Sequence, residues 1–293
     1  MGRYSINDIE KLSGIKAHTI RIWEKRHKVV EPKRTSSNIR YYDDQDLKRV
    51  LNISFLNNQG LKISAIASMQ DDELHEKVVQ LSRNGDGVGG NIERMIVSMI
   101  ELDERMLEKL FSEFTMKYGF EDTIVKIVFP FLKKIGVLWQ TGNISPAHEH
   151  FISNLLRQKI IVAIDALPTV DDNRTKILFY LPDGELHELG LLFYHYVAKK
   201  NNLKTIYLGQ SLPYADLLAV SKLQEPDLIF TSYISPLSTE ALNKQINRLL
   251  TDFADKTILL SGYQVMQNNL SLPDSIVRIA DAKEFKHFLL SIQ

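Results

Sequence analysis

The feature that most constrains the fold is a change in the spacing of apolar residues near Lys176. From there on, short continuous apolar runs at 177–181, 205–208, 227–230, 257–260 and 275–279 alternate with stretches of helical periodicity. Continuous runs of this length are typical of strands that a parallel sheet buries on both faces. Because the strands alternate with helices, expected over 188–200, 214–224, 239–253 and at the C-terminus, they predict a doubly wound α/β domain over 173–293.

Residues 92–172 show a different period. Apolar side chains recur at helical spacing from Met95 to Phe114, which predicts a bundle of about four helices. Before the bundle, residues 83–91 hold four of the 14 glycines of the chain. Such a segment is typical of a flexible connection, so we place a linker over 76–91.

The first 75 residues predict short helices and a β-hairpin. Ser5 suits an N-cap and Gly14 a helix stop, and a second helix is expected over 16–28 with Ile20 and Trp23 in the core. A polar and then β-rich segment after it predicts a hairpin wing, and acidic residues before Leu47 predict the start of another helix. Helix, tight turn and second helix is the helix-turn-helix arrangement, whose second helix enters the DNA major groove.

Charge is divided unevenly along the chain. The whole chain has 36 Lys and Arg against 36 Asp and Glu, but residues 1–70 alone have 13 against 7. Clustered cations neutralise phosphates, so the N-terminal segment is expected to bind a polyanion.

Several classes of protein are excluded by what the sequence lacks. It has no cysteine, so a metal would be held by His or a carboxylate, or would arrive inside a cofactor. Met1–Glu10 does not resemble a signal peptide and no apolar run reaches the roughly 18 residues of a membrane span, so we expect a cytoplasmic protein without a membrane partner. No nucleophile with a paired base and no phosphate loop is found, since the glycines at 87–90 lack a preceding strand, and we expect no enzyme.

The runs 4–14, 19–26, 32–34 and 38–42 closely resemble the DNA-binding domain of the MerR family. The resemblance implies a winged helix-turn-helix over 1–75 that binds a double-stranded DNA operator. It places DNA contacts on the second helix and the wing: Thr19, Arg21, Lys25, Arg26, Lys33, Arg34, Arg40, Tyr41 and Tyr42. The family usually has Gly where Asn38 stands, and Asn also tolerates a positive φ.

A second resemblance concerns a cofactor. Trp139 is followed after nine residues by Glu149 and His150, an arrangement similar to the cap over the cofactor in MerR-family regulators with a C-terminal cobalamin-binding module, of the CarH, CarA and LitR kind. Further on, Glu185 and His187 stand at the end of an expected strand with Gly190 after them, which resembles the Asp-x-His-x-x-Gly signature of cobalamin domains. A histidine at a strand's carboxyl end can reach a ligand in the crevice of such a sheet, and a carboxylate two residues earlier can hold its other nitrogen.

The resemblance implies that 92–172 is a cobalamin-capping bundle and 173–293 a flavodoxin-like, Rossmann-like cobalamin domain with His187 as the cobalt ligand. Gly190 would allow a close approach to the corrin, and Ser232, Ser261 and Gly262 match the segments around the nucleotide tail only loosely. Two residues of the predicted cobalamin module depart from the family pattern, Glu185 and Gln140.

Glu185 replaces the usual Asp, and its extra methylene shifts the carboxylate by more than about 1 Å unless the loop adjusts. Gln140 follows Trp139 where the light-sensing members have a His that ligates cobalt after photolysis. An amide is a poor cobalt ligand, so this residue counts against a light-locked adduct with two histidines.

Three functions are compatible with these observations. The first is a transcription regulator that binds adenosylcobalamin and changes between assemblies, as a homodimer or homotetramer, with a light response as a further hypothesis. The second is a MerR-type regulator whose degenerate module serves in dimerisation or protein binding. The third is the corrinoid carrier of a methyltransferase, against which the basic N-terminal segment counts.

Overall fold

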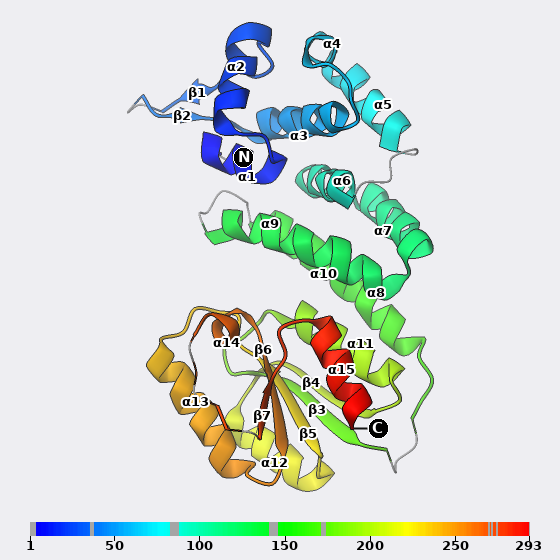
Figure 1. Ribbon diagram of the computed structural model, residues 1–293, viewed down its shortest axis with the longest axis vertical. Helices are drawn as coiled ribbons and strands as arrows, with labels where there is room; N and C mark the ends of the chain where they lie inside the picture. Colours follow the sequence, from blue (N-terminus) through cyan, green and yellow to red (C-terminus); the bar gives the residue numbers. More distant parts are fainter. Residues whose placement is uncertain are drawn as a thin grey trace. The chain divides into compact units, whose positions relative to one another are not determined.

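The computed structural model describes residues 4–35, 38–82, 88–140, 146–170 and 174–292, except 269, 271 and 274. Within these ranges, the side chains of residues 11, 75, 79–82, 88–90 and 137–140 lie outside the description. The chain forms two compact units, Met1–Ser153 and Asn154–Gln293, whose elements are labelled in Figure 1.

The first helix begins and ends where the sequence predicts. In α1 (Ile6–Ser13), the Ser5 hydroxyl accepts from the backbone N–H of Asp8, and the Asp8 carboxylate accepts from the backbone N–H of Ser5. Gly14 ends the helix with a φ of 73°. The reciprocal cap satisfies two backbone donors that the first turn of a helix leaves unpaired.

Helix α2 (Ala17–His27) packs against α1 and buries one of its sides. Ile20 and Trp23 are buried, as predicted, whereas Ile22 stays 46% exposed. Residues one or two positions apart point to different sides of a helix, so burying Ile20 and Trp23 leaves Ile22 outside.

The wing is a short antiparallel hairpin of β1 (Lys33–Arg34) and β2 (Arg40–Tyr41). Asn38 in its turn has a φ of 64°, the left-handed conformation that asparagine tolerates. A single bridge between Tyr4 and Tyr42 ties the base of the wing to the start of the chain.

The next helices complete the winged helix-turn-helix. Asp43 caps α3 (Asp44–Asn58) by accepting from the backbone N–H groups of Gln45 and Asp46. Helix α4 (Ile63–Ala67) follows after a turn.

The predicted linker over 76–91 contains helix at both ends. Helix α5 (Asp71–Ser82) continues to residue 82, and α6 (Val88–Ile100) begins at residue 88, while 83–87 lie outside the described residues. Leu74 and Val78 are buried four residues apart, so the packing of one helical face extends α5 beyond the expected boundary.

The bundle predicted after the linker is present. Its elements are α6, α7 (Glu104–Tyr118), a helix made of α8 (Phe120–Thr123), the π-helical turn η1 (Ile124–Val128) and α9 (Phe129–Gln140), and α10 (Pro146–Asp165). Met95, Met99, Leu110 and Phe114 are buried at the predicted helical spacing. Leu102 is instead 47% exposed, because it lies in the turn between α6 and α7 with a φ of 53°.

The parallel sheet confirms the predicted α/β fold. Its strands are β3 (Lys176–Pro182), β4 (Lys204–Leu212), β5 (Leu228–Ser232), β6 (Thr257–Ser261) and β7 (Ile276–Arg278). In the described residues they pair in the order β4-β3-β5-β6-β7, all parallel. This is the flavodoxin-like order, in which the strand sequence reverses direction between the first and third strands, here β3 and β5.

Helices cover both faces of the sheet (Figure 1). They are α11 (Glu188–Lys200), α12 (Tyr214–Gln224), α13 (Thr239–Asp252), α14 (Tyr263–Gln267) and α15 (Ala282–Ser291); only the short α14 was not predicted. On one face, Tyr194 of α11 and Phe285 of α15 pack against Phe230 of β5. The other face carries an aliphatic core in which Leu178 and Ile229 are fully buried.

In the part of the chain that the structure describes, no helix is long and apolar enough to cross a membrane.

Candidate functional site

The predicted histidine lies in the loop between β3 and α11, at the carboxyl edge of the sheet. The backbone N–H of Glu185 donates to the carbonyl of Pro182 at 2.9 Å, and Gly184 has a φ of 79°, so a tight turn leaves β3. His187 follows as the N-cap residue of α11. Because β3 pairs in parallel with β5, the loops after these two strands meet where the strand order reverses, the usual ligand site of such sheets.

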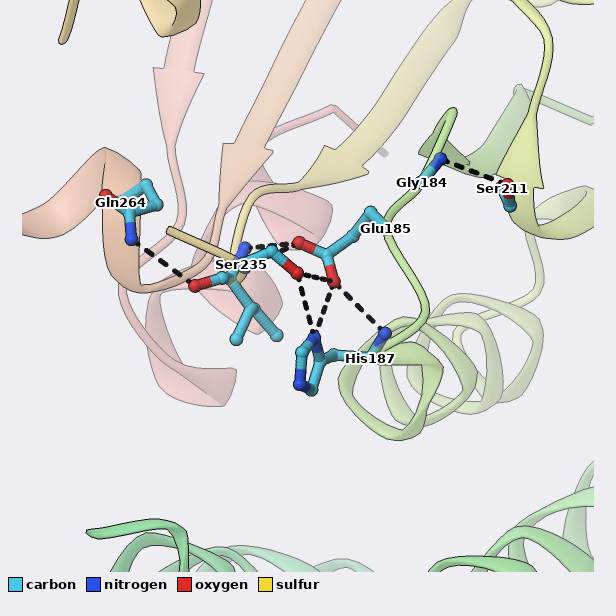
Figure 2. A network of polar contacts seen from close by, with 7 residues as sticks. Gly184, Glu185, His187, Ser211, Ser235 and Gln264 are labelled. Atoms are coloured by element: carbon cyan, nitrogen blue, oxygen red, sulfur yellow. Dashed lines mark hydrogen bonds and ion pairs between the residues drawn. The ribbon is translucent and has the colours of Figure 1, made fainter. Parts of the chain in front are cut away.

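The Glu185 carboxylate joins these two loops (Figure 2). Its Oε1 lies 2.6 Å from Nδ1 of His187, and its Oε2 accepts from the backbone N–H groups of Ile234 and Ser235 at 2.8 and 2.7 Å. The Ser235 hydroxyl donates to Oε1 at 3.0 Å. Glu185 is buried, whereas the His187 side chain is 50% exposed. The predicted contact between Glu185 and His187 is thus present.

The same contacts fix the tautomer of His187. Burial favours the neutral form of Glu185, but hydrogen bonds from His187 and from the backbone of Ser235 and Ile234 lower its pKa to about 2. An ionised carboxylate can only accept, so Nδ1 of the neutral ring carries the proton and Nε2 carries the lone pair. Figure 2 shows Nε2 turned away from Glu185 and Ser235. This is the arrangement that a metal-ligating imidazole requires.

The donor set suits a metal that arrives within a macrocycle. In the described residues, no group of three or more His, Asp or Glu side chains is placed to hold a bare ion. A corrin would bring the nitrogens that hold its own cobalt, so a single imidazole from the protein would be sufficient, as for the protein ligand of haem iron. The single His187 therefore fits a corrinoid better than a free metal ion.

The residues predicted around a nucleotide tail lie at the same edge. Ser232 and Ser261 are buried, directly paired at the ends of β5 and β6. The Ser261 hydroxyl donates to the carbonyl of Ile279 at 2.9 Å. Gly262 has a φ of 98°, and a Cβ there would approach the carbonyl oxygen of Tyr233 to 2.4 Å. Packing within the protein therefore already requires glycine at Gly262, whether or not a cofactor binds.

The other predicted cofactor contacts are less constrained by the protein itself. Gly190 lies in the first turn of α11, where a Cβ would meet no described atom within 4 Å. Near the start of α10, Glu149 is partly buried and His150 is exposed. The side chains of Trp139 and Gln140 lie outside the described residues, so their roles stay predictions.

Sequence reasoning missed the partners that hold Glu185. Ile234 and Ser235 stand 49 and 50 residues after Glu185, and two of the three contacts use backbone N–H groups. One signal was available. A buried carboxylate needs donors, and the loop after the adjacent strand is the nearest place to find them.

The predicted DNA contacts form a cationic surface on α2 and the wing. Six of the nine predicted contacts are basic and exposed: Arg21, Lys25, Arg26, Lys33, Arg34 and Arg40. Thr19 and Tyr41 are partly exposed. Lys33 forms an ion pair with Asp43, and Arg34 donates to the side-chain oxygen of Asn38 at 2.7 Å. These contacts shape the wing, and exposed cations on such an element are what phosphate binding requires.

Tyr42 requires a correction. Its side chain is fully buried and its hydroxyl donates to the carboxylate of Glu24 in α2. A side chain in this position supports the wing from inside, so we withdraw Tyr42 as a DNA contact and keep its neighbour Tyr41.

Together, a winged helix-turn-helix with an exposed basic surface and a flavodoxin-like domain with a carboxylate-held histidine define a class of protein. The class is a DNA-binding transcription regulator that carries its own ligand-binding module.

Comparison with known proteins agrees with this class. Residues 4–73 match the MerR HTH family regulatory protein, and residues 92–163 match the B12 binding domain. The HTH-type transcriptional repressor CarH of Myxococcus xanthus is 25% identical over 252 residues, 84% of each chain. The repressor CarA of the same organism is 24% identical over 260 residues, 88% of this chain and 85% of CarA.

One solved structure supports the fold alone. The monomethylamine corrinoid protein of Methanosarcina barkeri superposes with a TM-score of 0.50 at 14% identity, covering 67% of this chain and 95% of that chain. By sequence, the chain carries a MerR-type helix-turn-helix domain and a B12-binding domain and is homologous to the CarH and CarA repressors.

Proposed function

We propose that this protein binds an operator through residues 1–75 and a cobalamin, adenosylcobalamin in particular, through the modules at 92–172 and 173–293, where His187 would hold the cobalt. The observation that carries the proposal is the Glu185–His187 pair at the carboxyl edge of the sheet, 2.6 Å between carboxylate and Nδ1. When bound, cobalamin would supply a cobalt centre and a large rigid macrocycle.

The residues of this site act mainly by orientation. Glu185 fixes the imidazole plane and keeps Nε2 as the donor atom, and the backbone of Ile234 and Ser235 keeps Glu185 ionised. Gly190, Glu149, His150, Trp139 and the tail residues Ser232, Ser261 and Gly262 are the further contacts that we propose with the cofactor.

The N-terminal domain would bind DNA by two kinds of contact. Arg21, Lys25 and Arg26 lie on the exposed side of α2, where a recognition helix meets base edges and phosphates. Lys33, Arg34 and Arg40 on the wing would meet the backbone beside it. Because operators of this kind are read as half-sites, a homodimer or homotetramer is the proposed form.

Cofactor binding would control DNA binding through assembly. A ligand shifts an equilibrium between two states only by its different affinity for them, so cobalamin must bind one assembly more tightly than the other. A light response is a separate proposal, and Gln140 beside Trp139 counts against a locked adduct with two histidines. We further propose a cytoplasmic protein without membrane partner or enzymatic activity, since the curated relatives are transcriptional regulators.

The axial ligand can be tested directly. Protein labelled with ¹⁵N-histidine is loaded with cobalamin, reduced to the cob(II)alamin state, and compared with unlabelled protein by electron paramagnetic resonance. We expect the nitrogen splitting to change with the label in the wild type and not in His187→Ala. An unchanged splitting would assign the axial nitrogen to the cofactor's own base and contradict the ligand assignment.

The same preparation separates the alternative functions. Failure to retain any corrinoid on gel filtration would favour a regulator whose module serves only in dimerisation or protein binding. Retained corrinoid without salt-dependent operator binding would favour a corrinoid carrier of a methyltransferase.

A further inference from the structure

A second buried carboxylate stands directly after the histidine. Glu188 is the first residue of α11, and its side chain is only 8% exposed. Oε1 forms an ion pair with Nε of Arg157, and Oε2 accepts from the Tyr207 hydroxyl at 3.1 Å. A buried charge is tolerated when both of its oxygens are paired, so these contacts fix where Glu188 lies.

The partner in β4 is itself held in place. The ring of Tyr207 stacks on His195 with 5.0 Å between centroids and 15° between planes, and Nε2 of His195 lies 2.9 Å from the Thr205 hydroxyl. Burial and the nearby Glu188 raise the pKa of Tyr207, so its hydroxyl remains a donor. Burial lowers the pKa of His195 to about 4, so this histidine is neutral near pH 7. Arg157 and Glu188 are therefore the charged members of this network.

The two carboxylates tie His187 to different parts of the fold. Glu185, two residues before it, is bound to the loop after β5, whereas Glu188, one residue after it, is bound to α10 and β4. His187 is the N-cap of α11, so the direction of its side chain depends on where the helix begins. Moving the first turn of α11 would change where Nε2 points.

We propose that Arg157, Glu188 and Tyr207 are positioning residues that fix the start of α11 to α10 and so hold His187 in the direction that a corrinoid needs. This inference rests on the proposed function, which it extends from the ligand to the way the ligand is held. Arg157 lies within the B12 binding domain match of residues 92–163.

The test compares neighbouring substitutions on α10. Arg157→Met removes the ion pair, Arg157→Lys keeps a charge, and Gln158→Met changes an exposed neighbour as the matched control. Tyr207→Phe removes a single hydroxyl from the other side of Glu188. In cobalamin titrations followed by absorbance we expect Arg157→Met and Tyr207→Phe to weaken binding by about 3- to 10-fold, below the 10- to 100-fold typical of a direct partner of a metal-ligating histidine.

Two readouts separate orientation from a general loss of stability. The fraction of cob(II)alamin with the histidine splitting should fall in Arg157→Met and recover in part in Arg157→Lys. Without cofactor, hydrogen exchange should rise in the N-terminal half of α11 and remain unchanged in α13. Exchange, affinity and splitting equal to those of Gln158→Met would overturn the proposal.

The failure of the proposed function would look different. If the wild type retains no cobalamin, the axial-ligand assignment fails, and the exchange of α11 in the cofactor-free variants still decides whether Arg157 holds the helix start. Faster exchange spread over both α11 and α13 in Arg157→Met and Tyr207→Phe would contradict the positioning role.

Discussion

Ser54 in α3 lies 3.2 Å from a carboxylate oxygen of Glu93 in α6, and both side chains are buried. The Ser54 hydroxyl donates to this oxygen and also to the carbonyl of Ser13, at 2.8 Å, so its one proton is shared between two acceptors. Burial raises the pKa of Glu93 to about 7, with Lys134 and Ser54 acting in the opposite direction. A carboxyl group that titrates near neutrality thus joins the helix-turn-helix to the B12-binding domain.

Glu93→Gln should remove a pH dependence of stability. The folded pKa is raised above 4.5, so the folded state holds the proton more tightly, and stability falls as pH rises from 4.5 to about 7 and then levels off. The shift corresponds to at most about 3 kcal/mol. Urea unfolding across this window should show the decline in the wild type and a flatter profile in Glu93→Gln.

Glu101→Gln is the control, because Glu101 lies directly after the last residue of α6 and pairs with Lys48 at a partly exposed position. A decline in Glu93→Gln as steep as in the wild type would contradict the assignment. Lys134 is the charged group that acts on this carboxyl, and Arg94, next to Glu93 in sequence, is paired with Glu113.

Glu185 should be the most sensitive residue of the cofactor site apart from His187. Glu185→Gln keeps the size and removes the charge that fixes the imidazole, so we expect cobalamin affinity to fall by about 10- to 100-fold. Glu185→Asp shortens the side chain by one methylene, so it cannot hold both His187 and the Ser235 backbone without a movement of the loop, and we expect an intermediate loss. Absorbance titration measures both variants.

Asp183→Asn provides the control, since Asp183 is an exposed residue of the same turn and accepts only from the Ser211 hydroxyl among the hydrogen bonds described for it. Equal affinities of Glu185→Gln and Asp183→Asn would show that the carboxylate does not orient the ligand. The pKa of Glu185 is lowered to about 2, so its contribution to stability is complete above 4.5 and is lost as pH falls through 2.

The elements that the sequence predicts well are those with local signals. Ser5 and Gly14 mark the two ends of α1, which is eight residues long. Each strand of the sheet corresponds to one short apolar run of the sequence. Helices α11 and α12 have the predicted bounds, because a loop and a strand precede each one. Local capping and periodicity are sufficient for such elements.

The features that the sequence does not predict depend on distant partners. The glycines near residue 85 predicted a linker from residue 76, where the structure continues α5. The burial of Leu74 and Val78 stabilises this helix. Tyr42 adjoins exposed Tyr41 and Arg40 in sequence, and only the contact with Glu24, 18 residues earlier, shows that it belongs to the core. Ser235 contacts Glu185 although 50 residues separate them, because the strands before their two loops are neighbours in the sheet.

Tyr42→Phe should test the core assignment of this residue. Losing the hydroxyl leaves the partly buried Glu24 without this donor, so we expect a destabilisation of about 1 to 3 kcal/mol. Because Tyr42 is not an exposed contact, operator affinity at conditions that keep the domain folded should be unchanged. Thermal unfolding and DNA titration measure the two effects, and weaker DNA binding without lost stability would restore Tyr42 as a contact.

Arg21→Ala should weaken operator binding in a way that salt reveals. Arg21 is exposed on α2, and each phosphate that a cation neutralises contributes about one counterion to the dependence of affinity on salt. If Arg21 contacts a phosphate, the slope of log affinity against log salt should become shallower by about 1, equally for operator and unrelated DNA. If Arg21 contacts a base edge, the free energy of binding should weaken by about 1 to 3 kcal/mol for the operator alone. Arg248→Ala, an arginine of α13 in the other unit paired with Asp252, is the matched control and should leave both quantities unchanged. Wild-type slope and specificity in Arg21→Ala would remove Arg21 from the DNA interface, since it would then contribute to neither kind of contact.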